Sequence, residues 1–356
     1  MQTESTNKFI PSRPNFIDNK VVVVDGLVGG GKGLISQIIS ALPGVEMWVH
    51  RPQIEQVCGL HYLSHISMEG AITLIKTWVD EEAYNISMLR NTNCRPSDYS
   101  SIFKYPRKLS YMFRFFQKGR QSSMERFIKN KNILNVMTHA NTAYAEPIFQ
   151  ALEERLIYIR IVRSPVSAEY IYNHLGQWSK RWGSDIRSGM LLYKYNYNNN
   201  NLYMPYFVDI NEVLEYYQAS EIDKAIYMLK YWQNKGDSSI DKMKKKYNVK
   251  IIEIPFEKFV FNPEMFIDTV ASALQVKVDK VVMREMKKQK VPRKTISDAP
   301  AIDAYNEVGW KKPKANISLE DEFLLTKNYI KEKASSSAYK ELEKIYHTYI
   351  ERYAIF

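Results

Sequence analysis

The chain has 356 residues, 45% of them apolar, and a formal net charge of +11 at pH 7. This length allows one large α/β domain or two smaller ones with a substantial core. The sequence has no zinc-finger spacing, RNP-like aromatic strand or basic zipper, so the basic surplus does not indicate a nucleic-acid partner. We expect a lysine-rich solvated surface and a few cations gathered at one anion site.

Cysteine usage and the N-terminus indicate a reducing compartment. Cys58 and Cys94 are too few for a metal site by themselves or for a disulfide framework. Residues 1–6 are polar and lack the apolar core of a signal peptide. No apolar run reaches the length of a transmembrane segment. We therefore expect a soluble, cytoplasmic protein.

A phosphate-binding loop is predicted close to the start of the chain. After a polar lead-in over residues 1–19, residues 21–36 have the sequence VVVVDGLVGGGKGLIS. Four consecutive valines predict a short buried strand of a parallel sheet, and the apolar spacing after the glycines predicts a helix. Between such a strand and helix, free amides, the helix N-terminus and a lysine face an anion. The candidate ligands are Gly29, Gly30, Gly31, Lys32 and Gly33.

The exact form of this loop narrows the choice of ligand. Residues 26–33 match G-x-x-x-x-G-K-[ST] except at the last position, where Gly33 replaces the hydroxyl that usually holds Mg²⁺. A glycine-rich turn without a ligand is the alternative, but five glycines and a lysine between strand and helix favour phosphate binding. The loop predicts a bound polyphosphate or phosphosulfate without the usual magnesium ligand.

Three further strands are predicted along the chain. They lie at residues 133–137, 156–162 and 249–254, and the last is stopped by Pro255. Helical patterns separate these strands, which favours βαβ units. The predicted fold class is therefore α/β, with a parallel β-sheet flanked by helices.

An insertion at about residues 172–220 separates the third and fourth strands. A polar run at 195–201 predicts a solvated tip. The aromatic residues of the insertion either line an acceptor pocket or pack it onto the core: Trp178, Trp182, Tyr193, Tyr203, Tyr206 and Phe207. We expect one α/β domain over residues 20–317 and a charged helical segment over 318–356 packed on it.

Two polar residues follow predicted strands and are candidates for the same site as the glycine loop. His139 comes just after the strand at 133–137, and Arg163 just after the strand at 156–162. Loops at the carboxyl ends of the strands of such a sheet converge on the ligand. A histidine is suited to proton transfer near neutral pH, and an arginine offers a rigid fork for phosphate. Each residue alone is more often structural, but convergence on a phosphate loop favours function.

These segments resemble sulfotransferases that use 3′-phosphoadenosine 5′-phosphosulfate (PAPS). The matching stretches, in family order, are NVMTH at 135–139, LIYIRIVRSP at 156–165, KYW at 230–232, IPFEKFV at 254–260, NPE at 262–264 and RKTISD at 293–298. The resemblance implies that His139 is the catalytic base and that Lys32 stabilises the departing 5′-phosphate. It further implies that Arg163, Arg293 and Lys294 hold the 3′-phosphate. The implied architecture is the P-loop NTPase-like sulfotransferase fold, with PAPS as donor, 3′-phosphoadenosine 5′-phosphate (PAP) as product and no required metal.

Two positions depart from the family pattern. Gly29 stands where the loop usually has a basic residue, and Ile171 stands where a serine usually joins the arginine at the 3′-phosphate. Ser164 and Ser167 are candidate substitutes for that serine. The acceptor implied is a hydroxyl or an amine, and the aromatic insertion and basic surface favour a carbohydrate or a glycolipid head group.

Two other functions remain open from the sequence. The stretch from Val22 to Lys32 also resembles the opening of deoxynucleoside kinases, in which Asp25 or Ser36 would have to help hold Mg²⁺. The 293–294 basic pair has no obvious role in a kinase. The departures at Gly29 and Ile171 also allow a family member that binds a nucleotide or a glycan without turnover.

Overall fold

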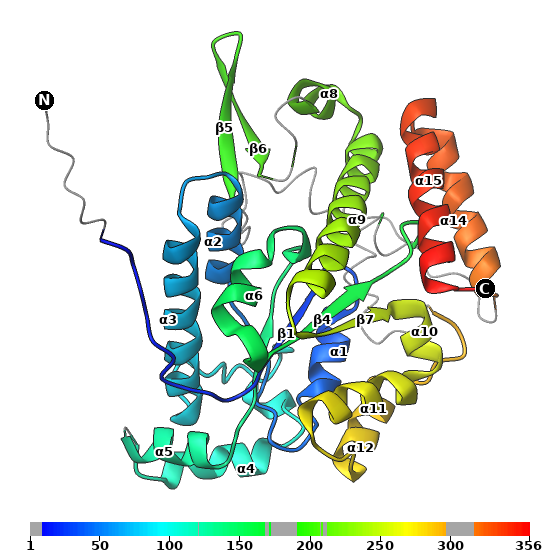
Figure 1. Cartoon of the computed structure of the whole chain (residues 1–356). Helices are drawn as coiled ribbons and strands as arrows, with labels where there is room; N and C mark the ends of the chain where they lie inside the picture. The colour runs from blue at the N-terminus through cyan, green and yellow to red at the C-terminus, as the bar shows by residue number, and fades with distance from the viewer. Residues whose placement is uncertain are drawn as a thin grey trace, which may run out of the picture.

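The computed structural model describes residues 9–119, 121–167, 171, 191–206, 208, 212–296 and 317–356. Its centre is a five-stranded, all-parallel sheet in the order β2-β3-β1-β4-β7 (Figure 1). The strands are β1 (Val21–Gly26), β2 (Val49–His50), β3 (Leu134–Met137), β4 (Leu156–Val162) and β7 (Lys250–Pro255). The α/β prediction is confirmed, as are the four predicted strands. The two-residue strand β2 was not predicted.

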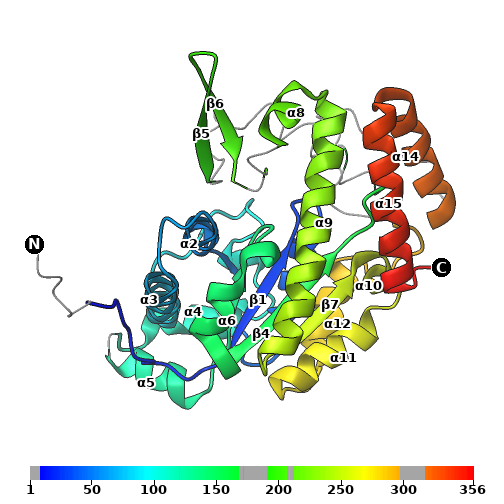
Figure 2. The same ribbon diagram turned by 45° about the horizontal axis from the view of Figure 1, so that its top comes forward.

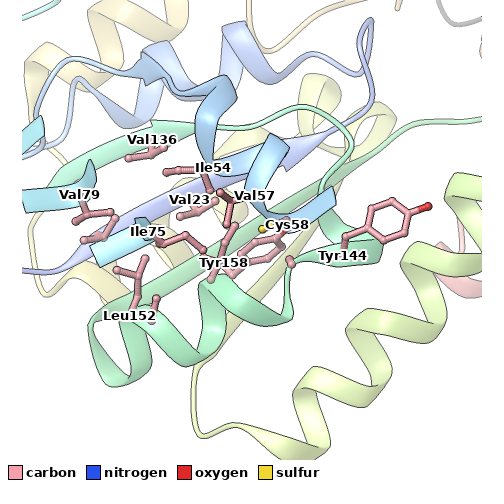
Figure 3. Packing of buried hydrophobic residues seen from close by; sticks show 14 of the residues in the cluster. Val23, Ile54, Val57, Cys58, Ile75, Val79, Val136, Tyr144, Leu152 and Tyr158 are labelled. Atoms are coloured by element: carbon pink, nitrogen blue, oxygen red, sulfur yellow. The ribbon is translucent and has the colours of Figure 1, made fainter. Parts of the chain in front are cut away.

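Strand β1 is central because both of its faces are apolar. Val21 and Val23 belong to the core on one face of the sheet, and Val22 and Val24 to the core on the other. Figure 3 shows Val23 and Val136 of the sheet packed against Ile54, Ile75 and other side chains of the covering helices. This double burial requires helices on both faces, as in α/β proteins with parallel sheets.

The helices form two layers (Figure 2). One core joins the sheet to α2 (Pro52–Tyr62), α3 (Met68–Ser87), α6 (Glu146–Leu152) and α9 (Glu221–Lys246). The other core joins it to α1 (Lys32–Ile39), α10 (Phe256–Phe261), α11 (Pro263–Leu274) and α12 (Lys280–Lys288). The carboxyl ends of β1, β3 and β4 therefore lie between two helical layers, where their loops can meet.

The C-terminal helices α14 (Leu319–Lys333) and α15 (Ser336–Tyr353) pack against α9 through a third apolar cluster. This cluster includes Leu229 of α9, Phe323 of α14 and Ile345 of α15. Tyr349 of α15 donates a hydrogen bond to the buried carboxylate of Glu257. The C-terminal segment thus contacts α10, the helix that follows β7.

The described part of the 172–220 insertion contains a hairpin and a short helix. Strands β5 (Leu192–Tyr197) and β6 (Asn200–Pro205) pair antiparallel, and α8 (Val213–Gln218) follows. The connection uses Asn198 and Asn199, both with positive φ, which suits the asparagine run. Tyr206 is buried against Tyr144, so this aromatic packs on the core. Trp178, Trp182 and Phe207 lie outside the described residues.

The remaining elements lie mainly at the edges of the sheet. They are η1 (Ile102–Lys104), α4 (Lys108–Met112), η2 (Phe113–Phe116), α5 (Gln121–Lys129), η3 (Thr142–Tyr144) and η4 (Glu153–Arg155). Asn19, just before β1, donates hydrogen bonds to the carbonyls of Phe127 and Asn132, so α5 lies at the amino-terminal edge of the sheet. None of the helices that the structure describes is both long and apolar enough to cross a membrane.

Candidate active site

The glycine loop connects β1 to α1 and requires glycine for a steric reason. Gly29 and Gly31 have φ of 83° and 92°, in the left-handed region that glycine adopts without strain. The amide of Gly30 closes the turn onto the carbonyl of Leu27 at 3.0 Å. A Cβ built on Gly31 would lie 2.2 Å from the ring of Phe256. Only glycine therefore fits between this loop and the first residue of α10.

Lys32 is folded back under the loop. Its Nζ donates to the carbonyls of Gly26 and Leu27 at 2.8 and 2.7 Å, and its side chain is buried. Burial lowers the pKa of Lys32 to about 8, although the carboxylates of Asp25 and Glu55 oppose the shift. A lysine whose charge is poorly solvated gains from an anion placed over the loop.

The Asp25 carboxylate, at the end of β1, binds the loop that follows β3. Its carboxylate is fully buried and accepts hydrogen bonds from the Thr138 hydroxyl at 2.8 Å and from the amides of Asn141 and Thr142 at 3.0 and 2.7 Å. Ser36 is also fully buried, on the inward side of α1. These two side chains, the candidate magnesium holders of a kinase, are therefore not presented at the loop surface.

His139 meets two side chains that the sequence did not single out. Its backbone amide donates to Glu55 Oε1 at 2.8 Å, and its Nδ1 lies 3.3 Å from the same oxygen. Its Nδ1 also lies 2.9 Å from Nε2 of His50, which in turn lies 2.8 Å from Glu55 Oε1. The two imidazole rings are edge to face, with centroids 4.3 Å apart. His50 from β2 and His139 from the loop after β3 thus meet at one carboxylate oxygen of Glu55 from α2.

The protonation states of His139 and Glu55 follow from their burial and from the charges around them. Burial and the nearby Lys32 cation lower the pKa of His139 to about 4, against the opposing effect of Glu55. Burial alone would raise the pKa of Glu55, but hydrogen bonds from His139 and His50 outweigh it and hold the pKa at about 2. At neutral pH the pair is a carboxylate and a neutral imidazole. Both Glu55 and His50 face Nδ1 of His139, and in the tautomer that donates from Nδ1 to Glu55 the lone pair lies on Nε2.

The same three side chains are the group that could hold a metal. One donor atom each from His50, Glu55 and His139 lies within 4.8 Å of the others. In the described part of the chain, no other set of three histidine, cysteine or acidic side chains meets this condition. Two imidazoles and a carboxylate suit divalent transition metals.

Arg163 lies on the other side of the loop, directly after β4. One guanidinium nitrogen donates to the carbonyl of Gly29 at 2.9 Å. The guanidinium carbon lies 4.2 Å from the centre of the Phe256 ring. The arginine thus crosses from its own strand to the glycine loop and stacks on an aromatic side chain, which fixes its plane.

Arg293 contacts the same ring from a different part of the chain. Its guanidinium carbon is 5.6 Å from the Phe256 ring centre, and its Nη1 donates to the carbonyl of Ile296 at 2.9 Å. Its backbone amide donates to the carbonyl of Val260 at 2.7 Å, which ties this loop to α10. Lys294, the next residue, is exposed. The structure therefore brings Arg163 and Arg293 together at Phe256, beside Gly31, and leaves Lys294 at the surface.

The positions of the candidate serines also become clear. Ile171 is fully buried in the cluster formed with α9 and the C-terminal helices, so its position is part of the core. Ser164 and Ser167 are buried close to the chain turn after Arg163. The amide of Ser164 donates to Glu257 at 2.9 Å, so Glu257 fixes the turn that carries Arg163.

One hollow adjoins the loop, and a groove lies between helices farther along the chain. The first is lined by Gly26, Leu27 and Arg163 from the sheet edge and by Trp232, Asp237 and Tyr353 from the helices α9 and α15. The other is an open groove between α2, η3 and α9, where the rings of Tyr62 and Tyr144 are tilted by 51° with centroids 4.4 Å apart. Asn234, Lys235 and Ser238 supply polar groups to this groove, and the Lys235 ammonium lies 3.2 Å from the Tyr62 hydroxyl.

Comparisons with known proteins give only distant matches. No protein-family model matches the sequence, and the search of curated proteins found no match. Among solved structures, the chain is similar to a sulfotransferase domain from the Synechococcus PCC 7002 olefin synthase, with 9% identity, coverage of 90% of this chain and 97% of that one, and a TM-score of 0.41. It is similar to the sulfotransferase STF9 from Mycobacterium avium, with 11% identity, coverage of 97% and 78%, and a TM-score of 0.42. A sulfotransferase domain from the curacin biosynthetic pathway matches with 7% identity, coverage of 89% and 99%, and a TM-score of 0.40. These three structures are all sulfotransferases.

Sequence reasoning missed His50, Glu55 and Phe256 as site residues. His50 and Glu55 carry no motif, but a short β-branched and aromatic run before Arg51-Pro52 is a signal of a strand followed by a helix start. Such a junction at the carboxyl edge of the sheet could have placed both residues near the loop. Phe256 follows a strand in the same way as Arg163 does.

Proposed function

We propose that the protein is a sulfotransferase that moves a sulfuryl group from PAPS to a hydroxyl or amine acceptor. The observation that carries the proposal is the pair of guanidinium groups on Phe256, the ring that also touches Gly31 of the glycine loop. A loop for one anion with a second cationic site beside it suits a donor with two separate phosphate groups. A nucleoside triphosphate, with its phosphates in a single run, needs no such second site.

In this proposal the donor lies across the loop. The amides of Gly29, Gly30, Gly31 and Gly33 and the Lys32 ammonium receive the 5′-phosphosulfate. Arg163, Arg293 and Lys294 receive the 3′-phosphate, the two arginines as pre-oriented forks. Lys32 leaves the carbonyls of Gly26 and Leu27 to meet the anion, and its burial increases the strength of that contact.

The transfer step needs one proton acceptor. The acceptor hydroxyl attacks sulfur in line, a new S–O bond forms, and the S–O bond to the 5′-phosphate breaks. The electron pair of that bond stays on the phosphate oxygen, where Lys32 and the loop amides stabilise it. Nε2 of His139 takes the acceptor proton, since Nδ1 faces Glu55 and no described residue pairs with Nε2. Gly33, Asp25 and Ser36 offer no magnesium ligand at the loop, and His139 acts here as a base and not as a metal ligand. We therefore propose that transfer requires no metal.

The groove along α2 and α9 supports a carbohydrate acceptor, free or as the head group of a glycolipid. Its lining includes Ala143, four residues after His139 in the chain, and Tyr62, seven residues after Glu55. Tyrosine ring faces suit the apolar faces of a sugar ring, and amide, hydroxyl and ammonium groups suit its hydroxyls. An acceptor screen in which only small phenols or amines are sulfated would contradict this choice.

The same residues argue against the two other functions, a kinase and a binding module without turnover. A kinase would need a magnesium ligand where Gly33, Asp25 and Ser36 provide none at the loop surface. A binding module without turnover would have no need for the neutral imidazole that Glu55 orients at His139.

Titration calorimetry of the full chain separates these functions. We expect PAP to bind in buffer with EDTA, and Arg163→Ala to weaken that binding by about 10–100-fold, the size of a lost charge-assisted hydrogen bond. The matched control is Arg284→Ala, an exposed arginine on α12, which should leave binding unchanged. Preference for ATP with Mg²⁺ would overturn the proposal in favour of a kinase, and binding of PAP without any sulfuryl transfer would favour the binding module.

A further inference from the structure

A short helical segment at the amino-terminal edge of the sheet has its apolar side facing outward. Helix α4 continues directly into η2, so residues 108–116 form one helical run. Leu109, Phe113 and Phe116 lie at i, i+4 and i+7 and so share one face of it. Their exposed fractions are 70%, 65% and 87%, whereas Tyr111 on the opposite face is 2% exposed. This is the reverse of what a surface helix of a globular protein normally shows.

Side-chain hydrogen bonds hold this segment in place, so its exposed apolar side chains have a fixed orientation. Arg114 donates to both carboxylate oxygens of Glu46 at 3.0 and 2.8 Å and to the carbonyl of Ile86 at 3.0 Å. Arg107 donates to the carboxylate of Asp279 at 2.6 Å. The inner face is thus fixed by two arginines while the aromatic face has no cover from the described residues.

The neighbouring residues of the chain carry more exposed apolar side chains and several exposed lysines. Phe103, Phe115 and Ile128 are also exposed. Among the described residues of this region, the exposed cations are Lys104, Lys108, Lys118, Lys129 and Lys131. Residues 103–132 hold nine lysines and arginines but only one acidic residue, Glu125, so they account for +8 of the net charge of +11. We call this surface the aromatic–lysine face.

We propose that the aromatic–lysine face docks the protein on an anionic membrane surface. Phenylalanine and leucine side chains can enter the acyl boundary of one leaflet while the surrounding lysines meet anionic lipid head groups. A second copy of the chain is a poor occupant, because it would place five lysines against the same five lysines. Contiguous exposed apolar side chains also mark interaction surfaces in general.

Docking in this way would leave the candidate active site accessible. The aromatic–lysine face adjoins α5, which Asn19 ties to the start of β1, whereas the glycine loop follows the end of β1. Figure 1 shows α4 and α5 at the end of the molecule away from the β5–β6 hairpin. The proposal is independent of the sulfotransferase assignment, since none of its residues belongs to that site.

Vesicle co-sedimentation of the full chain tests the proposal. We expect binding to vesicles with about 30 mol % phosphatidylserine, little binding to pure phosphatidylcholine vesicles, and a fall in binding as salt rises. The double variant Phe113→Ser/Phe116→Ser should lose at least about tenfold in partitioning. The control is Leu324→Ser/Leu325→Ser, which removes two exposed leucines of α14 that are 55% and 57% exposed. It should behave as the wild type.

A second measurement guards against a variant that fails to fold. With Phe116→Trp, the emission added relative to the wild type should shift to the blue when phosphatidylserine vesicles are present. Failure of the wild type to bind either vesicle would overturn the proposal and favour an acidic protein partner. Equal binding by the double serine variant, or an unshifted emission, would also overturn it.

Discussion

The two sides of the glycine loop are built on different principles. On the anion side, Arg163 and Arg293 stack on Phe256, and both are held by backbone carbonyls. On the proton side, His139 and His50 share one oxygen of Glu55. The anion side holds two guanidinium groups against one aromatic ring, and the proton side keeps an imidazole neutral beside a carboxylate. This difference teaches that donor binding and turnover should be separable by mutation.

The largest effect expected on the proton side comes from His139→Ala. If Nε2 of His139 takes the acceptor proton, turnover should fall by about 10²–10⁴-fold, the usual contribution of a general base. PAP binding should stay within about twofold of the wild type, because the arginines and loop amides are intact. Turnover and calorimetric affinity measured on one preparation check both parts. An equal loss of turnover and of PAP affinity would show that the two sides do not act separately.

The next effect tests whether Glu55 acts through His139. With Glu55→Gln the carboxylate that accepts from the His139 amide and faces its Nδ1 is lost, and we expect turnover to drop by about 10–100-fold. In the double variant with His139→Ala, the same change should cost almost nothing further, because residues that act as a unit are not additive. A full additional loss in the double variant would show that Glu55 acts independently of the imidazole.

How far the sequence predicts the two sides also differs. The anion side follows from local patterns: the valines of β1, the glycines and Arg163 each lie within or directly after an apolar strand, so topology alone brings them together. The proton side depends on α2 being packed over the sheet, which places Glu55 against a loop 84 residues away in sequence. No spacing rule predicts a contact that arises from tertiary packing.

Phe256 shows the same limit on the anion side. The strand that ends at Pro255 could be predicted, and so could a helix after it, but the contact between the Phe256 ring and Gly31 arises from the β7–α10 corner. The insertion was only partly predicted, since Tyr206 packs on the core and the hairpin around Asn198 and Asn199 was expected only as a solvated tip. Side-chain burial of this kind is decided by packing and not by composition.

A methyl group inserted between the glycine loop and the Phe256 ring tests the anion side alone. In Gly31→Ala the new Cβ would meet the Phe256 ring at 2.2 Å and displace both stacked arginines, so PAP affinity should fall by about tenfold or more. The matched control is Gly44→Ala, which also has positive φ, 75°, but has open space at its Cβ. It should lower the free energy of unfolding by roughly 1 kcal/mol and leave PAP affinity unchanged. An affinity loss in Gly44→Ala of the same size would attribute the effect to general instability.

The last prediction concerns the pH dependence of kcat/KM. It is the most specific one, because the acid limb reports on His139 and the alkaline limb on Lys32. His139, with its pKa lowered to about 4, is neutral and able to accept a proton at all higher pH values, so activity should fall only below about pH 4. Lys32, with its pKa lowered to about 8, loses its charge above that pH, so activity should fall by about tenfold per pH unit above pH 8. Glu55 raises both pKa values through its negative charge, and Glu55→Gln should therefore move both limbs of the profile to lower pH. An acid limb near pH 6.5 in the wild type would show that His139 titrates as a solvated imidazole. If only the acid limb moved in Glu55→Gln, the Glu55 charge would not affect the pKa of Lys32. Lys32 would then belong to the anion side alone.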